Sequence, residues 1–163
     1  MGTFDKTDEL HLRNLVFGVE DGIVSTVGLL SGIAIASVPR STILLTGVVL
    51  IFVEAISMAA GSFLSEASVD DLSEESSPKA SVSAGAIMFA SYFAAGFVPL
   101  MPYHFLEVGQ AFAVSVLASL LTLFALGYWS GRGSRKPMKK ALRMMLVGGA
   151  AIVVGILAGS LLA

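Results

Sequence analysis

The stretch Leu15–Ser37, LVFGVEDGIVSTVGLLSGIAIAS, decides the fold of this chain. A helix needs about 20 predominantly apolar residues to cross the hydrocarbon core of a bilayer, and this stretch is long enough to do so. It nevertheless holds two adjacent carboxylates, Glu20 and Asp21. A charged side chain at the centre of a membrane costs roughly 2.5–3.5 kcal/mol on insertion scales, so such residues are found facing a partner, a cavity or an ion.

Four further apolar blocks follow the first one. The chain of 163 residues is 55% hydrophobic and 13% charged, with a mean hydropathy of +0.85, whereas a soluble domain carries about 25% charged residues. Pro39 ends the first block, and Pro99 and Pro102 are expected to end the third. We therefore predict an all-α, polytopic membrane protein with a single transmembrane domain over residues 1–163 and five spans, at about 15–37, 42–64, 80–100, 106–129 and 141–163.

The distribution of Lys and Arg predicts the orientation of these spans. With five spans, the N-terminus shares one side of the membrane with the linker after the second span, residues 65–79, and with the connection after the fourth. Arg40 alone falls on the other side, and nine basic residues fall on the first: Lys6, Arg13, Lys79, Arg132, Arg135, Lys136, Lys139, Lys140 and Arg143. Because basic residues are enriched in cytoplasmic segments, we expect a cytosolic N-terminus and a C-terminus outside the cell or in a lumen.

The composition excludes several kinds of chemistry. The chain has no Cys, so it has no disulfide, no thiolate metal site and no cysteine nucleophile. His11 and His104 lie outside the predicted spans, which makes an intramembrane enzyme the least favoured class. The first 14 residues are polar, and no cleavable signal peptide is expected. We expect no resident cofactor and no nucleic-acid partner.

The second block carries a carboxylate and a thioether that share one helix face. Glu54 lies near the middle of that block, and Met58 is four residues further on. Carboxylate oxygens suit hard divalent ions, and a thioether adds affinity for softer transition metals. With Asp21 supplying an opposing oxygen from the first helix, the pattern predicts a site for Fe²⁺ or Mn²⁺. The structural alternative is that Met58 only fills a gap in the packing and that the two acids only bridge helices.

Glu20 is a further candidate metal ligand, but it points about 100° away from its neighbour Asp21. It would otherwise reach the cytosolic interface or bond a neighbouring helix. Small residues four apart let helix backbones approach closely, so the first two helices are expected to cross tightly and frame a site. The pairs and strips of this kind are Gly18 and Gly22, Gly28 and Gly32, Ser57, Gly61 and Ser65, and Gly155 and Gly159.

Two motifs in the first two blocks resemble the vacuolar iron transporter family. They are GVEDGIVSTVGLLSG in the first block and EAISMAAGSFLS in the second. The family is similar in having five spans, a G-x-x-D-G motif in the first helix and an S-M-x-x-G-x-x-x-S motif in the second. The matching positions here are Gly18, Asp21 and Gly22, and then Ser57, Met58, Gly61 and Ser65.

The resemblance implies a homodimer that moves Fe²⁺, and often Mn²⁺, out of the cytosol in exchange for protons. It also implies that Asp21 and Met58 lie on the path of the metal, which is cargo and not a cofactor. Five spans are few to enclose a path, so a site shared by two copies, with an Asp21 from each, is expected. The partners would then be membrane lipid, a divalent metal ion, protons and a second copy of the chain.

This chain departs from the family pattern in two places. Many members carry a Glu two turns before the second-helix Met, where this chain has Leu50, and Glu54 would substitute for it one turn later. Many members also place a helical metal-binding domain between the second and third spans, where this chain has only the acidic linker 65–79. That linker would be either a solvated acidic segment or a segment that weakly attracts divalent cations. Its acids are Glu66, Asp70, Asp71, Glu74 and Glu75.

Two alternatives to an iron or manganese antiporter remain open at this point. One is a channel or exporter for another small cation, and the other is a non-transport assembly subunit of a membrane complex. The expected location is a prokaryotic cell membrane or, alternatively, an organellar membrane such as that of the vacuole.

Overall fold

The computed structural model describes residues 6–71, 78–133 and 136–162, and within them it contains helices and no strand. All five helices are long and apolar enough to cross a membrane, which confirms the predicted all-α fold class. Their bounds are α1 Lys6–Ile35, α2 Arg40–Asp70, α3 Pro78–Phe105, α4 Val108–Ser130 and α5 Pro137–Leu162.

The helices are longer than the apolar blocks at the end that carries the N-terminus. α1 begins at Lys6, nine residues before the expected start, and α2 continues to Asp70. Residues 65–70 of the expected linker are therefore helical, because an apolar block marks the part of a helix that meets lipid and not the whole helix. Glu74 and Glu75 lie outside the described residues.

The prediction that Pro99 and Pro102 end the third helix is wrong. α3 runs through both prolines to Phe105, because membrane helices tolerate proline. Neighbouring helices also bond carbonyl groups near this end of α3. Ser115 on α4 donates a hydrogen bond to the Pro99 carbonyl oxygen at 2.7 Å. Arg40, at the start of α2, donates to the Tyr103 carbonyl oxygen at 2.6 Å and also bonds that of His104. Arg40 thus caps the C-terminal end of α3.

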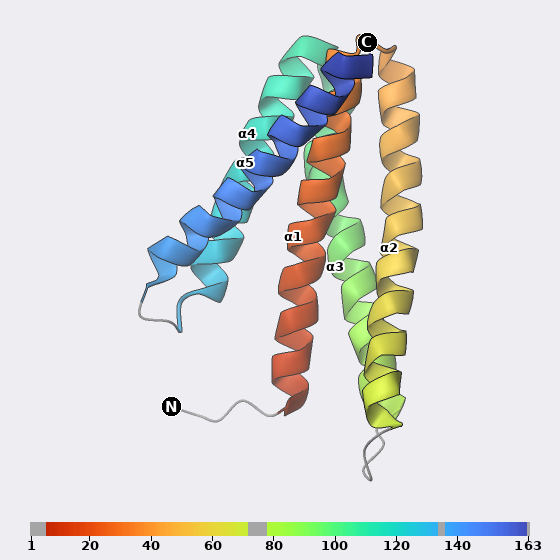
Figure 1. Ribbon diagram of the computed structural model, residues 1–163, viewed down its shortest axis with the longest axis vertical. Coiled ribbons are helices and arrows are strands. Elements are labelled where there is room, and N and C mark those ends of the chain that lie inside the picture. The colour runs from red at the N-terminus through yellow and green to blue at the C-terminus, as the bar shows by residue number, and fades with distance from the viewer. Residues whose placement is uncertain (1–5, 72–77, 134–135, 163) are drawn as a thin grey trace.

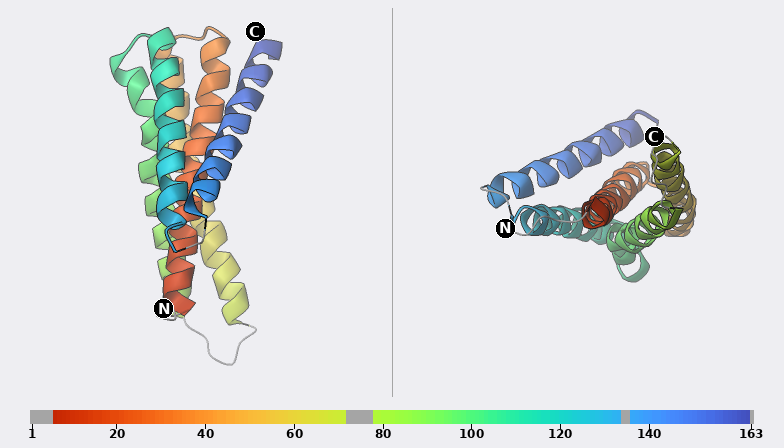
Figure 2. Two further views of the ribbon diagram at one scale, coloured as in Figure 1. Left: turned by 90° about the vertical axis from the view of Figure 1, so that its left-hand side faces the viewer. Right: turned by 90° about the horizontal axis from the view of Figure 1, so that it is seen from below.

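α1 lies between two helical pairs, with α2 and α3 on one side and α4 and α5 on the other (Figures 1 and 2). It packs mainly on α3 and α5, and α2 packs mainly on α3. The α4–α5 pair leans away from α1 toward the end where α1 begins, and the start of α1 and the end of α5 lie at opposite ends of the bundle (Figure 1). The described basic residues lie at the N-terminal end, except for Arg40.

Most of the buried apolar core lies away from the N-terminal end. One cluster is built from α1, α2, α3 and α4 and includes Leu30, Ile51 and Tyr103, and a second joins Ile23 to Leu123 and neighbouring residues. α2 and α5 instead present large exposed apolar side chains, such as Leu64 on α2 and Leu146 on α5. In a membrane these faces meet lipid or another protein.

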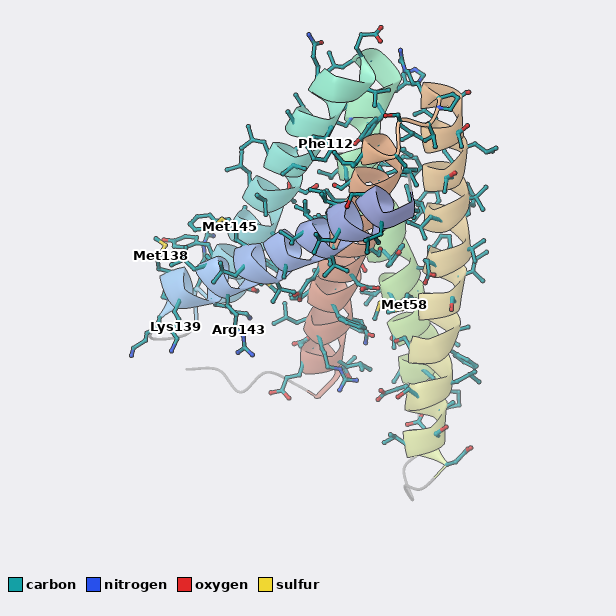
Figure 3. The ribbon with its side chains drawn as sticks, turned by 45° about the horizontal axis from the view of Figure 1, so that its top comes forward. Met58, Phe112, Met138, Lys139, Arg143 and Met145 are labelled. Carbon is teal, nitrogen blue, oxygen red and sulfur yellow. The ribbon has the colours of Figure 1, made fainter. Side chains whose placement is uncertain are left out.

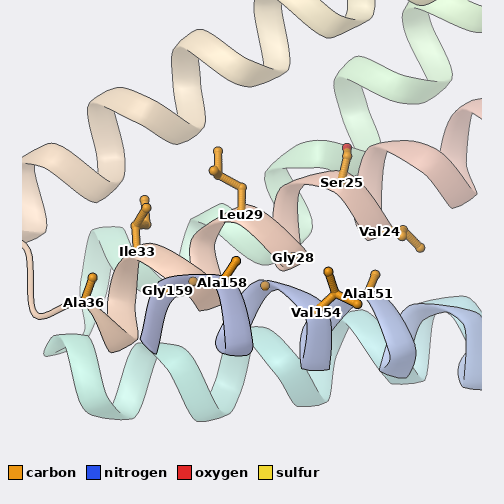
Figure 4. A pocket seen from close by; sticks show the side chains of 12 residues that line it. Val24, Ser25, Gly28, Leu29, Ile33, Ala36, Ala151, Val154, Ala158 and Gly159 are labelled. Carbon is orange, nitrogen blue, oxygen red and sulfur yellow. The ribbon is translucent and has the colours of Figure 1, made fainter. Parts of the chain in front are cut away.

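Glycine pairs set the two closest helix contacts of α1. Gly28 and Gly32 lie against Gly155 and Gly159 of α5, carbonyl to Cα, with no side chain between the backbones. Figure 4 shows α1 and α5 side by side along an apolar groove of about 510 Å³.

The other glycine pair of α1 packs against α3, so the expectation that it would meet the second helix is wrong. A Cβ at Gly22 would lie 2.6 Å from the Tyr92 carbonyl oxygen, and one at Gly18 would strike the Ser91 side chain. α2 stands further from α1 because larger side chains, among them Phe17 and Met58, lie between them and line a cavity. The small strip Ser57, Gly61 and Ser65 faces outward beside that cavity.

Candidate metal site

A row of polar contacts joins α1 to α2, which run antiparallel. At its outer end the Arg13 guanidinium lies 3.5 Å from a Glu66 carboxylate oxygen. One turn deeper, the Ser62 hydroxyl donates a hydrogen bond to the Asn14 amide oxygen at 2.7 Å. The Asn14 nitrogen donates to the Leu10 carbonyl at 2.9 Å. Asn14 is buried and held at both ends of its side chain, so it is a fixed element of this row.

A cavity of about 460 Å³ lies behind this row, between α1, α2 and α3. Met58 from α2 and Met88 from α3 both line it, so two thioethers border one space. Met58 lies on the side of α2 turned toward α1 and α3 (Figure 3). The full lining is Arg13, Asn14, Phe17, Ser57, Met58, Gly61, Ser62, Ser65 and Met88.

The two predicted acidic ligands meet one turn deeper than the two methionines. Asp21 is one helical turn beyond Phe17, and Glu54 is one turn from Met58 on the antiparallel helix. The charge of Glu54 acts on the Asp21 carboxylate, so the two groups are close in space. Both side chains are half-buried. Within the described residues neither carboxylate has a hydrogen-bond or ion-pair partner, unlike most acids kept inside membranes.

A tyrosine from α3 closes the row on its inner side. The Ser25 hydroxyl donates to the Asp21 backbone carbonyl at 2.7 Å, and it lies 2.6 Å from the Tyr92 hydroxyl. Because the single Ser25 proton is already used, the Tyr92 hydroxyl is the donor in the second bond. Tyr92 is fully buried, and the charges of Asp21 and Glu54 both act on it.

Glu20 faces a different space from the other predicted ligands. It lines a cavity of about 390 Å³ between α1 and the α4–α5 pair, together with Lys140 and Ser130. The negative charge of Asp21 acts on the Glu20 carboxylate, and so, to a smaller extent, do the positive charges of Lys140 and Arg143. Asp21 thus interacts electrostatically with both of the other acids. Glu54 lies one turn from Met58 on α2, whereas Glu20 lines the cavity toward α4 and α5.

Sequence reasoning missed three residues of this region, which are Asn14, Met88 and Tyr92. Asn14 is two helical turns before Asp21, and that spacing on one face was the available signal. Met88 and Tyr92 come from α3, where nothing in the local pattern separates them from packing residues. Among the described residues no three His, Asp or Glu side chains gather into a metal cluster. The cavity beside the two acids instead offers thioether, hydroxyl and amide side chains.

Residues 12–81 and 70–160 match the VIT family. The chain belongs to this family. It is 32% identical over 161 residues to a vacuolar iron transporter homolog of Arabidopsis thaliana, with 90% of this chain and 81% of the relative covered. It is 24% identical over 200 residues to vacuolar iron transporter 1 of Oryza sativa subsp. japonica, with 84% and 79% covered.

The comparison also locates where this VIT family protein is short. The alignment with the rice protein spans 200 positions, more than the 163 residues of this chain, so the rice protein carries inserted residues. The two family matches overlap at residues 70–81, a range that includes the end of α2, the connection to α3 and the start of α3. A short connection at this point fits a VIT family member that lacks an inserted cytosolic domain.

Proposed function

We propose that this VIT family protein moves a divalent transition metal, Fe²⁺ or Mn²⁺, out of the cytosol in exchange for protons. The observation that carries the proposal is the pair Asp21 and Glu54 within the membrane-spanning bundle. Among the described residues neither carboxylate has a hydrogen-bond or ion-pair partner, and the charge of Glu54 acts on Asp21. Family membership supports metal transport, and the relatives are named as iron transporters, which favours transport over catalysis.

The donor set favours the first-row transition metals. Two carboxylates offer hard oxygen ligands, and the thioethers of Met58 and Met88 line the space next to them. Sulfur ligands add affinity for Fe²⁺ over Mg²⁺ or Ca²⁺, which prefer oxygen alone. The amide oxygen of Asn14 lines the same cavity, so a metal entering it meets oxygen and sulfur together.

Exchange with protons follows from the chemistry of the same acids. A divalent metal requires deprotonated ligands, so its binding releases any proton held by Asp21 or Glu54. If the site opens alternately to the two sides, metal and protons compete for it and move in opposite directions. The cavity lies near the end of the bundle that carries most of the basic residues, and the positive-inside rule makes that end cytosolic.

A homodimer would complete the site. In the single chain Ser57, Gly61 and Ser65 form an outward-facing strip of small residues at the edge of the cavity, and a Cβ at Gly61 would meet nothing within 4 Å. Strips of this kind let a second helix approach closely, so a second copy would close the cavity on its open side. Active protein that is monomeric in detergent and in membranes would contradict this arrangement.

The direct test is metal uptake into sealed liposomes that contain the purified protein. We expect Fe²⁺ or Mn²⁺ uptake to quicken when the side receiving the metal is acidic, and the internal pH to rise as metal enters. Competition with Mg²⁺, Zn²⁺ and Co²⁺ distinguishes the proposal from a channel for another cation. Uptake that is insensitive to the pH gradient would rule out proton exchange, and absence of uptake would favour the assembly-subunit alternative.

The two cavity methionines are predicted to set metal preference. Met58→Leu and Met88→Leu keep the side-chain volume and remove only the sulfur, so the fold should change little. We expect the preference of each variant for Fe²⁺ over Mg²⁺, measured as the Mg²⁺ concentration that halves Fe²⁺ uptake, to fall roughly tenfold. A loss of this size is typical of weakened metal ligation. Met101→Leu, at an exposed position of α3, is the matched control and should behave as wild type. Unchanged selectivity in both cavity variants would assign these methionines to packing.

The names of the relatives also bear on location. Of the two membranes expected from the sequence, the plant vacuolar transporters support the organellar one and lend no support to a prokaryotic cell membrane. We therefore propose a vacuole-like acidic compartment as the destination of the metal, which would also supply the protons for exchange.

A further inference from the structure

The C-terminal helical pair has an unusually one-sided charge. All 12 acidic residues of the chain precede residue 108, so α4, α5 and their connection contain none. The same region holds six basic residues, all of them between Arg132 and Arg143. In the described part of the chain they gather at the end of the α4–α5 pair that lies toward the N-terminal end of the bundle.

Aromatic side chains place this basic group at the level of lipid headgroups. Tyr128 and Trp129 are both exposed in the last turn of α4, and the Arg132 guanidinium lies 5.8 Å from the centre of the Tyr128 ring. Tyr and Trp are enriched where a membrane meets water. The α4–α5 pair also ends short of α1, α2 and α3 at this end (Figure 1), so its basic residues lie nearer to the membrane than the ends of those helices do.

The start of α5 presents a face that combines basic and apolar side chains. Lys139, Leu142, Arg143 and Leu146 follow the spacing of one helix face, and all four are exposed. Figure 3 shows Lys139 and Arg143 extending from the same end of α5. Lys139 lies nearest the start of the helix, and Leu142, Arg143 and Leu146 follow it in this order along the same face. The positive charges of Lys140 and Arg143 act on the Glu20 carboxylate. The positive charge that faces outward therefore comes mainly from Lys139 and Arg132.

We propose that this end of the α4–α5 pair binds the phosphate headgroup of an anionic phospholipid, with an acyl chain along Leu142 and Leu146. Clusters of basic residues next to a membrane helix attract anionic lipids, and each basic side chain raises the affinity about fivefold. The site is separate from the metal cavity, because α1 lies between them (Figure 2).

Trp129 makes the proposal measurable, because it is the only Trp of the chain and lies beside the basic group. Bromine on a lipid acyl chain quenches Trp fluorescence on contact, so the protein is placed in vesicles of phosphatidylcholine with increasing brominated phosphatidylglycerol. We expect half-maximal quenching at a much lower fraction of brominated phosphatidylglycerol than of brominated phosphatidylcholine. Equal quenching by the two lipids would overturn the proposal.

The double variant Arg132→Gln with Lys139→Gln should weaken this preference roughly 30-fold. The matched control is Lys79→Gln, which removes one exposed charge at the same end of the bundle but from α3. A loss in the control equal to that of Lys139→Gln alone would show general charge attraction and refute a site. If the double variant fails to fold, Lys139→Gln alone changes a single exposed side chain and must still show about a fivefold loss.

Inorganic phosphate at millimolar concentration separates the lipid from a soluble anion. We expect it to leave the quenching by brominated phosphatidylglycerol unchanged. Competition by free phosphate would mean that the site recognises a soluble phosphate compound, and it would overturn the assignment to a phospholipid.

Discussion

Asp21→Asn is expected to lower the initial rate of Fe²⁺ uptake into liposomes by about 100-fold or more. Asparagine keeps the size of the side chain but removes the negative charge, and a neutral amide is a far weaker ligand for a divalent metal. Loss of a supporting group around a metal already costs about 10–100-fold, so loss of a direct charged ligand should cost at least as much. The fold should survive, because within the described residues the Asp21 carboxylate bonds no other side chain.

Glu20→Gln is the matched control for this experiment. It removes a carboxylate from the neighbouring position of α1, but one that faces Lys140 across a different cavity. We expect its uptake to stay within about threefold of wild type. Glu54→Gln should resemble Asp21→Asn, because Glu54 is the acid whose charge acts on Asp21. Uptake near the wild-type rate in Asp21→Asn, or equal losses in Asp21→Asn and Glu20→Gln, would contradict the proposed site.

Gly159→Ala is expected to give the largest loss of stability from a single methyl group. A Cβ at this position would overlap the backbone of α1 at Gly32, including its carbonyl oxygen and Cα. A backbone neighbour cannot turn away as a side chain can, so α5 must move as a whole. Overpacking of this kind costs roughly 1–3 kcal/mol and occasionally more, and we expect the upper end of that range. Thermal unfolding of the purified protein in detergent, followed by circular dichroism, measures the change.

The same helix provides the control for that substitution. Gly149 is also in α5, and a Cβ there would meet nothing within 4 Å. Gly149→Ala should therefore leave the unfolding temperature unchanged or raise it slightly, because Ala favours helix over Gly by up to about 1 kcal/mol. Equal destabilisation by the two substitutions would show that glycine acts through helix flexibility and not through the contact of α1 with α5.

The sequence was sufficient for the five helices, and the reason is local. Long apolar blocks must be helical inside a membrane, because no other open structure satisfies the backbone there. Asp21 and Glu54 stood out because carboxylates are costly in such blocks, and their role as metal ligands stays a prediction. Helix ends were less predictable, since both proline positions of α3 and the polar start of α1 continue the helix.

The partners of the helices could not be predicted in the same way. The spacing of Gly18 and Gly22 shows that some helix approaches closely, but it does not say which one, and the structure places α3 there. Met88 and Tyr92 were missed for the same reason. A methionine or tyrosine inside an apolar block is ordinary until the neighbouring helix is known, and only the three-dimensional arrangement puts these side chains beside Asn14 and Asp21.

The contact of α1 with α5 through bare backbone has a mechanical consequence. Where side chains interlock, turning one helix against another requires several rotamers to change at once, and the barrier grows with each of them. At Gly28, Gly32, Gly155 and Gly159 there are no rotamers to change. At these four positions the contact itself offers little resistance to rotation of α5 against α1, so any such rotation is limited by the side chains that pack around the contact and not by the contact.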